Sequence, residues 1–375
     1  MREGKGELVV EFKRNGQVIG ELSSCWIHLL DVRKMYERVK VTPDHPDLIA
    51  QPSDFVGSDV DEKPPEPIMS WVGDSAGHEF VKDPDEEEKY LIFVHGWRMT
   101  YAGSQKYAET MFKRLWHGGY KGRYSFVRWP TYSEDTHAVT DALFTYNNSD
   151  YRAWKSGRSL AEYVASLPPS YTVNVTAHSM GNIVVGAAIR EGMRVVNYGL
   201  LNAAVPAMCY EDNSALYINV RETPDGDDDP VTSELGFGDK LRFTHGANLV
   251  NFFLRNDEAL EAWETNNSIF KPQRYGATRL TGYYYDRSQA QGMRLGINFW
   301  SSRDRFLRAF HEAAALATAS RTRTVGAEGR TGGAVNESVD MGTLYGFGST
   351  HSAQWKWRCQ YTDDFYEGLI EKLKL

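Results

Sequence analysis

From residue 90 onward, short apolar runs alternate with longer stretches of helical periodicity. Apolar runs without an alternating polar face are typical of strands that are buried on both sides of a parallel sheet, and the stretches between them supply crossover helices. The runs predict strands at 90–94, 124–129, 171–176, 195–201, 247–254 and 280–285. The periodic stretches predict helices at 104–117, 153–166, 181–193, 304–320 and 362–374. We therefore expect an α/β fold with a mostly parallel sheet flanked by helices.

Two smaller parts precede this region. Residues 1–40 predict a small β element, because two alternating runs flank Asn15-Gly16, a dipeptide typical of tight hairpin turns, and a third apolar run follows at Cys25–Leu30. Residues 41–88 are Asp-rich and hold seven of the chain's 14 prolines, which indicates a linker. The main domain is then expected at 89–375, with insertions near 205–246 and 258–350.

The charge balance, the length of the apolar runs and the cysteine spacing each argue against a class of protein. The chain has 375 residues, and 42 Lys and Arg against 50 Asp and Glu give a net charge of −8, which disfavours nucleic-acid binding. No apolar run reaches the roughly 18 residues of a transmembrane helix. The start of the chain has no signal-peptide core, so the default expectation is a cytoplasmic protein, although a trimmed piece of an exported parent would look the same. The three cysteines are too widely spaced for a metal site or a disulfide framework.

The sharpest motif is Ala177-His178-Ser179-Met180-Gly181, which lies between an apolar strand and a predicted helix. This strand–turn–helix context is that of a nucleophile elbow, usually written G-x-S-x-G. The serine of an elbow has a strained backbone, so the residues two positions before and after it pack closely and must be small. Ala177 and Gly181 meet this requirement. Ser179 is therefore the predicted nucleophile.

Together with the strand and turn that end in His95-Gly96-Trp97, this motif resembles the α/β-hydrolases, most closely bacterial members whose function is not assigned. The resemblance covers about residues 88–375. It implies an α/β-hydrolase fold with cap or loop insertions, to which the N-terminal β element is a small appendage. It also implies an oxyanion hole formed by the backbone N–H groups of Trp97 and Met180. His95 is expected to be a structural turn residue.

The resemblance implies the chain order Ser, then Asp or Glu, then His for the catalytic residues. Asp257 follows the apolar run 248–254 and is the predicted acid, with Glu258 as the fallback. The alternative role for Asp257 is to cap the helical run that follows it. A later acid such as Asp286 stays open, because 94 residues separate Asp257 from the predicted base, far more than one strand requires.

Two histidines follow Asp257. His311 lies in a helical run and is expected to pack or to face solvent. His351 lies in a loop of small residues just before the C-terminal helix, from which an imidazole reaches over the edge of the sheet. His351 is therefore the predicted general base.

These residues predict a serine hydrolase that cleaves a carboxylic ester of a small-molecule or lipid-like substrate through an acyl-enzyme, with no metal or organic cofactor. A thioesterase, an amidase or an acyltransferase would use the same residues. Two other classes stay open. One is an inert binding or scaffold module, and the other is a metal hydrolase built on the acidic cluster Asp225–Asp229, whose lack of paired histidines favours a solvated turn.

Overall fold

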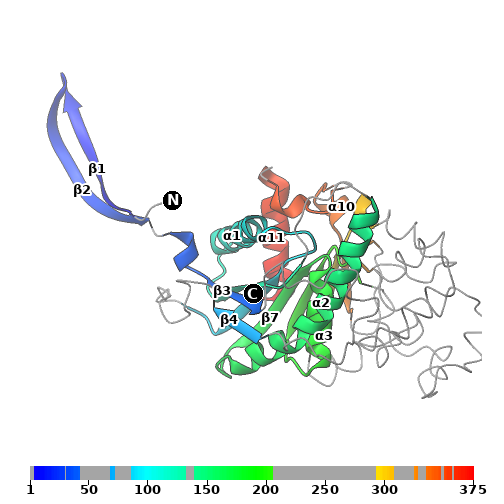
Figure 1. The fold of residues 1–375 in the computed structure, drawn as a ribbon. Coiled ribbons are helices and arrows are strands. Elements are labelled where there is room, and N and C mark those ends of the chain that lie inside the picture. Colours follow the sequence, from blue (N-terminus) through cyan, green and yellow to red (C-terminus); the bar gives the residue numbers. More distant parts are fainter. Residues whose placement is uncertain are drawn as a thin grey trace, which may run out of the picture.

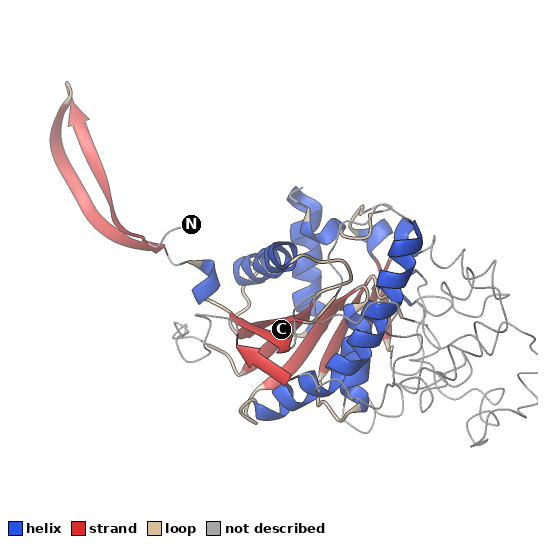
Figure 2. Ribbon diagram, viewed as in Figure 1, coloured by secondary structure: helices blue, strands red, loops and turns tan. Residues whose placement is uncertain are grey.

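A computed structural model describes ten segments of the chain: residues 4–29, 31–42, 68–71, 86–131, 139–205, 293–307, 325–327, 335–347, 350–356 and 359–375. Figures 1 and 2 show these segments as a layered α/β body with a long β-hairpin that projects from it.

The body is built on one eight-stranded sheet, whose strand order is β10-β9-β8-β7-β5-β6-β3-β4. Only the edge pair β3 and β4 is antiparallel, and the other neighbours pair in parallel. The strands are β3 (Glu37–Thr42), β4 (Ile68–Trp71), β5 (Lys89–Val94), β6 (Arg123–Arg128), β7 (Thr172–His178), β8 (Asn197–Leu201), β9 (Leu295–Trp300) and β10 (Glu337–Asp340). The expected mostly parallel sheet is confirmed.

Helices cover both faces of this sheet. α2 (Val139–Ser166) and α3 (Gly181–Arg190) lie on one face, whereas α1 (Tyr101–His117) and α11 (Cys359–Leu373) lie on the other (Figure 1). The short elements among the described residues are α10 (Met341–Leu344) and the 3₁₀ turns η1 (Val32–Lys34), η6 (Val325–Ala327) and η7 (Ala353–Trp355). None of the described helices is both long and apolar enough to cross a membrane.

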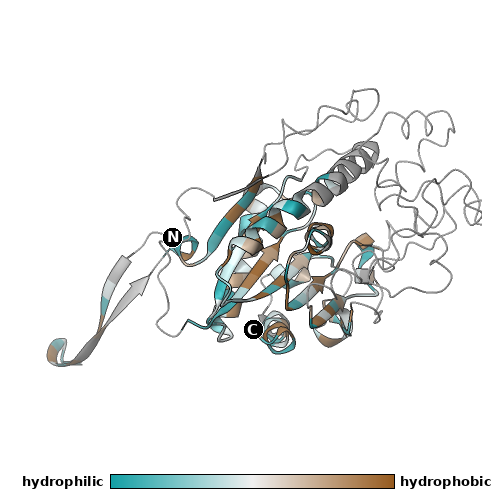
Figure 3. Cartoon of the chain, turned by 90° about the horizontal axis from the view of Figure 1, so that it is seen from below, coloured by the Kyte–Doolittle hydropathy of each residue, from teal (hydrophilic) through white to brown (hydrophobic). Residues whose placement is uncertain are grey.

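The central strand β5 shows how one sheet supports two hydrophobic cores. Successive side chains of a strand point to opposite faces. Tyr90, Ile92 and Val94 accordingly join the core beneath α2 and α3, whereas Leu91 and Phe93 join the core beneath α1 and α11. All five are buried, so the strand has no polar face, and brown, hydrophobic stretches lie within the sheet in the hydropathy view of Figure 3.

The structure also differs from the expected strands. β5, β6, β7 and β8 match predicted runs within a few residues, but the runs 247–254 and 280–285 lie outside the described residues. β9 and β10 were not predicted. Gly296 and Asn298 interrupt the apolar run of β9, and β10 is a four-residue Glu-Ser-Val-Asp segment, so neither strand carries the pattern of a buried strand.

At the N-terminus, β1 (Gly4–Arg14) and β2 (Gln17–Leu29) form the predicted hairpin, and β2 takes in most of the predicted third run. Asn15 and Gly16 have φ values of 53° and 80°, which the tight primed turn of a two-residue hairpin requires. The main sheet begins earlier than the expected boundary at residue 89, because β3 and β4 pair into it.

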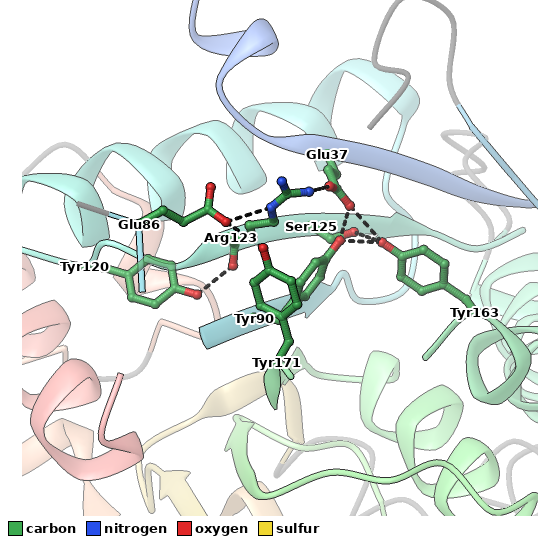
Figure 4. Close-up of polar contacts among 8 residues, drawn as sticks. All are labelled: Glu37, Glu86, Tyr90, Tyr120, Arg123, Ser125, Tyr163 and Tyr171. Carbon is green, nitrogen blue, oxygen red and sulfur yellow. Dashed lines mark hydrogen bonds and ion pairs between the residues drawn. The ribbon is translucent and has the colours of Figure 1, made fainter. Parts of the chain in front are cut away.

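A buried polar cluster joins the amino-terminal ends of β3, β5 and β6 to α2 (Figure 4). The carboxylate of Glu37, the first residue of β3, accepts hydrogen bonds from the hydroxyls of Tyr90 and Tyr163. Arg123 forms ion pairs with Glu37 at 3.2 Å and with Glu86 at 3.0 Å. The outer contacts of the cluster run from Tyr163 to Ser125, from Tyr171 to Glu86 and from Tyr120 to the backbone of Arg123.

Burial raises the pKa of the Glu37 carboxyl, although the hydrogen bond from Tyr90 and the charge of Arg123 act in the opposite direction. The folded protein therefore holds this proton more tightly than the unfolded chain does. The contribution to stability is complete at acidic pH and is lost as the pH rises from the ordinary range of Glu through the raised pKa.

Glu37→Gln removes this ionisation. We expect the free energy of unfolding of the variant, relative to that of the wild type, to increase as the pH rises through this window. Urea unfolding at pH values from about 4 to about 8 measures the difference, and Glu162→Gln, an exposed carboxylate on α2, is the matched control. If the free energy of unfolding of Glu37→Gln minus that of the wild type stays constant or falls as the pH rises, the pKa of Glu37 is not raised in the folded protein.

Candidate active site

Ser179 occupies the turn between β7 and α3 with a φ of +52°. Non-glycine residues rarely adopt this left-handed conformation, which places a side chain in a sharp turn at the end of a strand. The backbone N–H of Ser179 donates to the carbonyl of Leu201 at 2.9 Å, and its carbonyl accepts from the side-chain amide of Asn182 at 2.8 Å and from the backbone of Ala204 at 3.2 Å. Neighbouring segments therefore hold the strained turn from both ends.

Two glycines make room for this turn. A Cβ at Gly181 would lie 2.4 Å from the carbonyl oxygen of His95 and 2.7 Å from that of Val94, so no larger residue fits without moving the backbone. A Cβ at Gly96 would lie 2.9 Å from the Cβ of Ser179. The close packing expected around an elbow is thus present, and it brings the turn after β5 against the turn after β7.

His351 is brought to this elbow by the segment after β10. Its ring centroid lies 4.8 Å from that of His178, the residue before Ser179. Its Nδ1–H donates to Oδ2 of Asp304 at 2.6 Å. Its Nε2 is buried and has no hydrogen-bond partner among the described residues. A carboxylate therefore fixes one ring nitrogen, and the other keeps a lone pair for accepting a proton.

Asp304 is fully buried, four residues after the end of β9, and other groups satisfy its oxygens. Oδ2 accepts a second hydrogen bond, from the side-chain amide of Asn202 at 2.9 Å, and Oδ1 accepts one from the backbone N–H of Leu307 at 3.1 Å. Asn202 itself has a φ of +44° and accepts from the side chain of Gln354. The carboxylate is therefore held in one orientation toward His351.

Asp304 was not among the residues predicted from the sequence. The predicted acid Asp257 and its alternatives Glu258 and Asp286 lie outside the described residues. The signal for Asp304 is its position just beyond a strand, but the interrupted apolar pattern of β9 concealed that strand. Ser179 occupies the turn after β7, and His351 contacts the residue before it, His178. His311 is also outside the described residues.

The two residues expected to form the oxyanion hole lie in the turns that follow β5 and β7. Met180 caps the N-terminus of α3, where backbone N–H groups have no partner within the helix. Trp97 follows Gly96, which packs against Ser179. Both positions are at the carboxyl ends of parallel strands, where α/β proteins bind ligands.

His95 has the structural role expected of it. Its Nδ1–H donates to the carbonyl of Gly96 at 2.8 Å, and its Nε2 accepts from the backbone N–H of Trp129 at 3.3 Å. Burial lowers the pKa of His95 to about 3, so the ring is neutral near neutral pH. Both nitrogens are engaged, and His95 shapes the turn that leads to Trp97.

One aromatic ring lies against His351, and a second packs against the first. The ring of Phe306 lies 4.6 Å from the imidazole, and the ring of Trp97 lies 6.1 Å from Phe306. The guanidinium of Arg98 lies over Trp97 at 5.5 Å. Within the described segments, no three His, Cys, Asp or Glu side chains gather in a way that would hold a metal ion, and the acidic cluster Asp225–Asp229 lies outside them.

Gly181→Ala tests the packing of the elbow. Two backbone carbonyls block the added methyl group, so we expect the free energy of unfolding to fall by about 1–3 kcal/mol. Gly6→Ala is the matched control, because a Cβ at Gly6 would meet nothing within 4 Å, and it should change stability by less than about 0.5 kcal/mol. Urea unfolding compares the two variants, and equal effects would show that the elbow is not tightly packed.

Comparison with solved structures finds matches that include a type II thioesterase, YbtT, from the yersiniabactin NRPS/PKS biosynthetic pathway, in a mutant form. The two chains are 13% identical with a TM-score of 0.32, and the match covers 76% of this chain and 93% of the thioesterase. At this level of similarity, the likeness bears on neither substrate nor mechanism. A search of curated proteins finds no match.

A family profile described as "Alpha/beta hydrolase of unknown function (DUF900)" matches residues 74–294. The matched region contains Ser179, Trp97 and Met180 and ends before Asp304 and His351. It spans more than half of the chain, and it includes the strands β5 to β8, which form the centre of the sheet. The chain has an α/β-hydrolase fold and belongs to this α/β-hydrolase family.

Proposed function

We propose that this protein is a serine hydrolase that cleaves a carboxylic ester through an acyl-enzyme on Ser179, with His351 as general base and Asp304 as the acid that orients it. One observation carries the proposal: the strained elbow of Ser179 lies beside an imidazole whose Nδ1–H is bonded to a buried carboxylate at 2.6 Å and whose Nε2 has no partner among the described residues. A serine hydroxyl needs such a pair, because it is a weak nucleophile near neutral pH.

In the acylation step, Oγ of Ser179 attacks the ester carbonyl carbon while Nε2 of His351 accepts its proton. The carbonyl oxygen becomes an oxyanion, and the backbone N–H groups of Trp97 and Met180 are the proposed donors to it. When the tetrahedral intermediate collapses, the bond to the leaving oxygen breaks. His351 returns the proton to that oxygen, so an alcohol leaves and the acyl group stays on Ser179.

In the deacylation step, a water molecule attacks the acyl-enzyme and gives its proton to His351. Collapse of the second intermediate breaks the bond to Oγ of Ser179, which regains the proton, and the carboxylic acid leaves. Asp304 stabilises the imidazolium that forms in both steps, because its carboxylate accepts a hydrogen bond from Nδ1–H of His351. This chemistry needs no metal or organic cofactor.

The surroundings of His351 favour a small-molecule or lipid-like ester with an apolar part. Phe306 lies beside the imidazole and Trp97 packs against Phe306, and a charged group would lose its hydration against such aromatic surface. A series of p-nitrophenyl esters of increasing acyl length tests this preference. A preference for the longer chains is expected, and turnover of none of them would contradict the assignment of a carboxylesterase.

A fluorophosphonate probe tests the nucleophile directly. We expect the wild type to be labelled at Ser179, as mapped by peptide mass spectrometry, and Ser179→Ala to be unlabelled. Hydrolysis of the best ester should fall by a factor of about 10⁴ or more in this variant. An unlabelled, inactive wild type would instead support the inert scaffold, and activity that persists in Ser179→Ala but is lost with a chelator would support a metal hydrolase.

Paired substitutions identify the acid. We expect Asp304→Asn to slow labelling of Ser179 by about 10³- to 10⁴-fold, because the amide stabilises neither the correct tautomer nor the imidazolium. Asp257→Asn should stay within about threefold of the wild-type rate constant. The reverse result, with Asp257→Asn slow and Asp304→Asn near the wild type, would return the role of the acid to Asp257.

A further inference from the structure

His178, the last residue of β7, connects the elbow to the segment that carries His351. It precedes Ser179 directly, and its side chain is buried. Its Nε2 lies 3.0 Å from the backbone carbonyl oxygen of His351. The two imidazole rings lie 4.8 Å apart between centroids. A contact between the elbow and the main chain of the proposed base thus runs through this one side chain.

The hydrogen bond fixes the tautomer of His178. A carbonyl oxygen accepts only, so Nε2 of His178 must carry the proton and donate. Nδ1 then holds a lone pair, and it is buried without a hydrogen-bond partner among the described residues. A Cβ placed on Gly96 would lie 2.9 Å from this Nδ1, which shows that the ring fills the space against the turn that leads to Trp97.

The ring is also neutral. Burial, together with the neighbouring His351, lowers the pKa of His178 well below its ordinary value. A charged His178 would oppose the imidazolium that forms on His351 during the reaction, since two positive charges would then lie side by side in a buried site. As a neutral ring with a fixed N–H donor, His178 avoids this repulsion and still holds the segment that carries His351.

Aromatic contacts keep His178 in this orientation. The ring of Trp355, which belongs to η7, packs edge-on to it at 4.5 Å, and the ring of Tyr107 from α1 stacks on Trp355 at 4.5 Å. His178 therefore contacts His351 and Trp355, four residues farther along the same segment. The imidazole cannot turn away without disturbing this packing.

Building on the proposed function, we infer that His178 is a positioning residue for the reaction: the hydrogen bond from its Nε2–H to the carbonyl of His351 holds the general base over Ser179. His178 takes no part in proton transfer. Its Nε2–H already donates to the carbonyl of His351, and the lone pair on its Nδ1 faces Gly96. Loss of the bond frees the main chain of His351, and small misplacements of a catalytic group lower rates steeply.

Three substitutions of His178 distinguish a role in positioning His351 from a role in stabilising the fold alone. His178→Gln keeps an amide donor at about the reach of Nε2, His178→Asn shortens that reach, and His178→Leu removes the donor. Fluorophosphonate labelling of Ser179 gives two readouts, since its final extent counts folded sites and its rate constant reports how well the base is placed. His117→Leu, at the exposed end of α1, is the matched control for loss of a histidine.

We expect His178→Leu and His178→Asn to lower the labelling rate constant by about 10- to 100-fold at an unchanged final extent. The kcat for the best p-nitrophenyl ester should fall in parallel, while KM changes by less than about threefold. His178→Gln should stay within about threefold of the wild type, and His117→Leu should be indistinguishable from it.

Two kinds of result would overturn the inference in different ways. If the wild type and the Leu and Asn variants react at the same rate, His178 only stabilises the fold, and the proposed function stands. His178 is likewise limited to a structural role if the Gln variant is as slow as the Leu variant. If the wild type itself is not labelled at Ser179, the proposed function fails and the inference fails with it.

Discussion

The backbone conformation of Ser179 is the constraint on which the rest of the site depends. A serine at a φ of +52° is held there only because surrounding groups compensate for the strain. Asn182 and Ala204 donate to its carbonyl, and Gly181 and Gly96 allow the neighbouring turns to approach within contact distance. In the proposed mechanism, this sharp turn presents the hydroxyl of Ser179 at the carboxyl end of β7.

The proposed base and acid belong to one connected chain of hydrogen bonds that begins on α11. The hydroxyl of Tyr366 on α11 donates to the carbonyl of Gln354, whose side chain donates to Asn202. Asn202 donates to Asp304, which accepts from His351. Each link comes from a different part of the fold, so the orientation of the imidazole depends on the packing of a helix, two strand ends and a loop. One member is only partly satisfied, because the buried Oε1 of Gln354 has no hydrogen-bond partner among the described residues.

His178 and His95 show that histidines near the elbow have separate roles. Both are buried and have lowered pKa values, so neither takes up a proton near neutral pH. His95 shapes the turn after β5 through Gly96 and Trp129, and His178 contacts the main chain of His351. Of these three histidines, only His351 combines a nitrogen that has no partner among the described residues, Nε2, with a hydrogen bond to a carboxylate.

The sequence predicted the centre of this structure and missed its edges for physical reasons. The continuous apolar runs of β5 to β8 and the small residues around Ser179 are local patterns that burial and strain impose, so the parallel sheet and the elbow could be read from them. His351 was predicted from chain order and its loop. Asp304 was not, because β9 carries Gly296 and the buried Asn298, and its pattern is decided by contacts across the sheet. The same holds for β3 and β4, whose short runs become part of the main sheet only through pairing with β6.

The central claim is that Ser179, His351 and Asp304 act as one unit. Fluorophosphonate labelling rates of His351→Ala, Asp304→Ala and the double variant measure this most directly, because residues that act as a unit give losses that do not add. We predict that the double variant reacts within about threefold of His351→Ala. A double variant whose loss is the product of the two single losses would show that Asp304 acts independently of His351 and would contradict the claim.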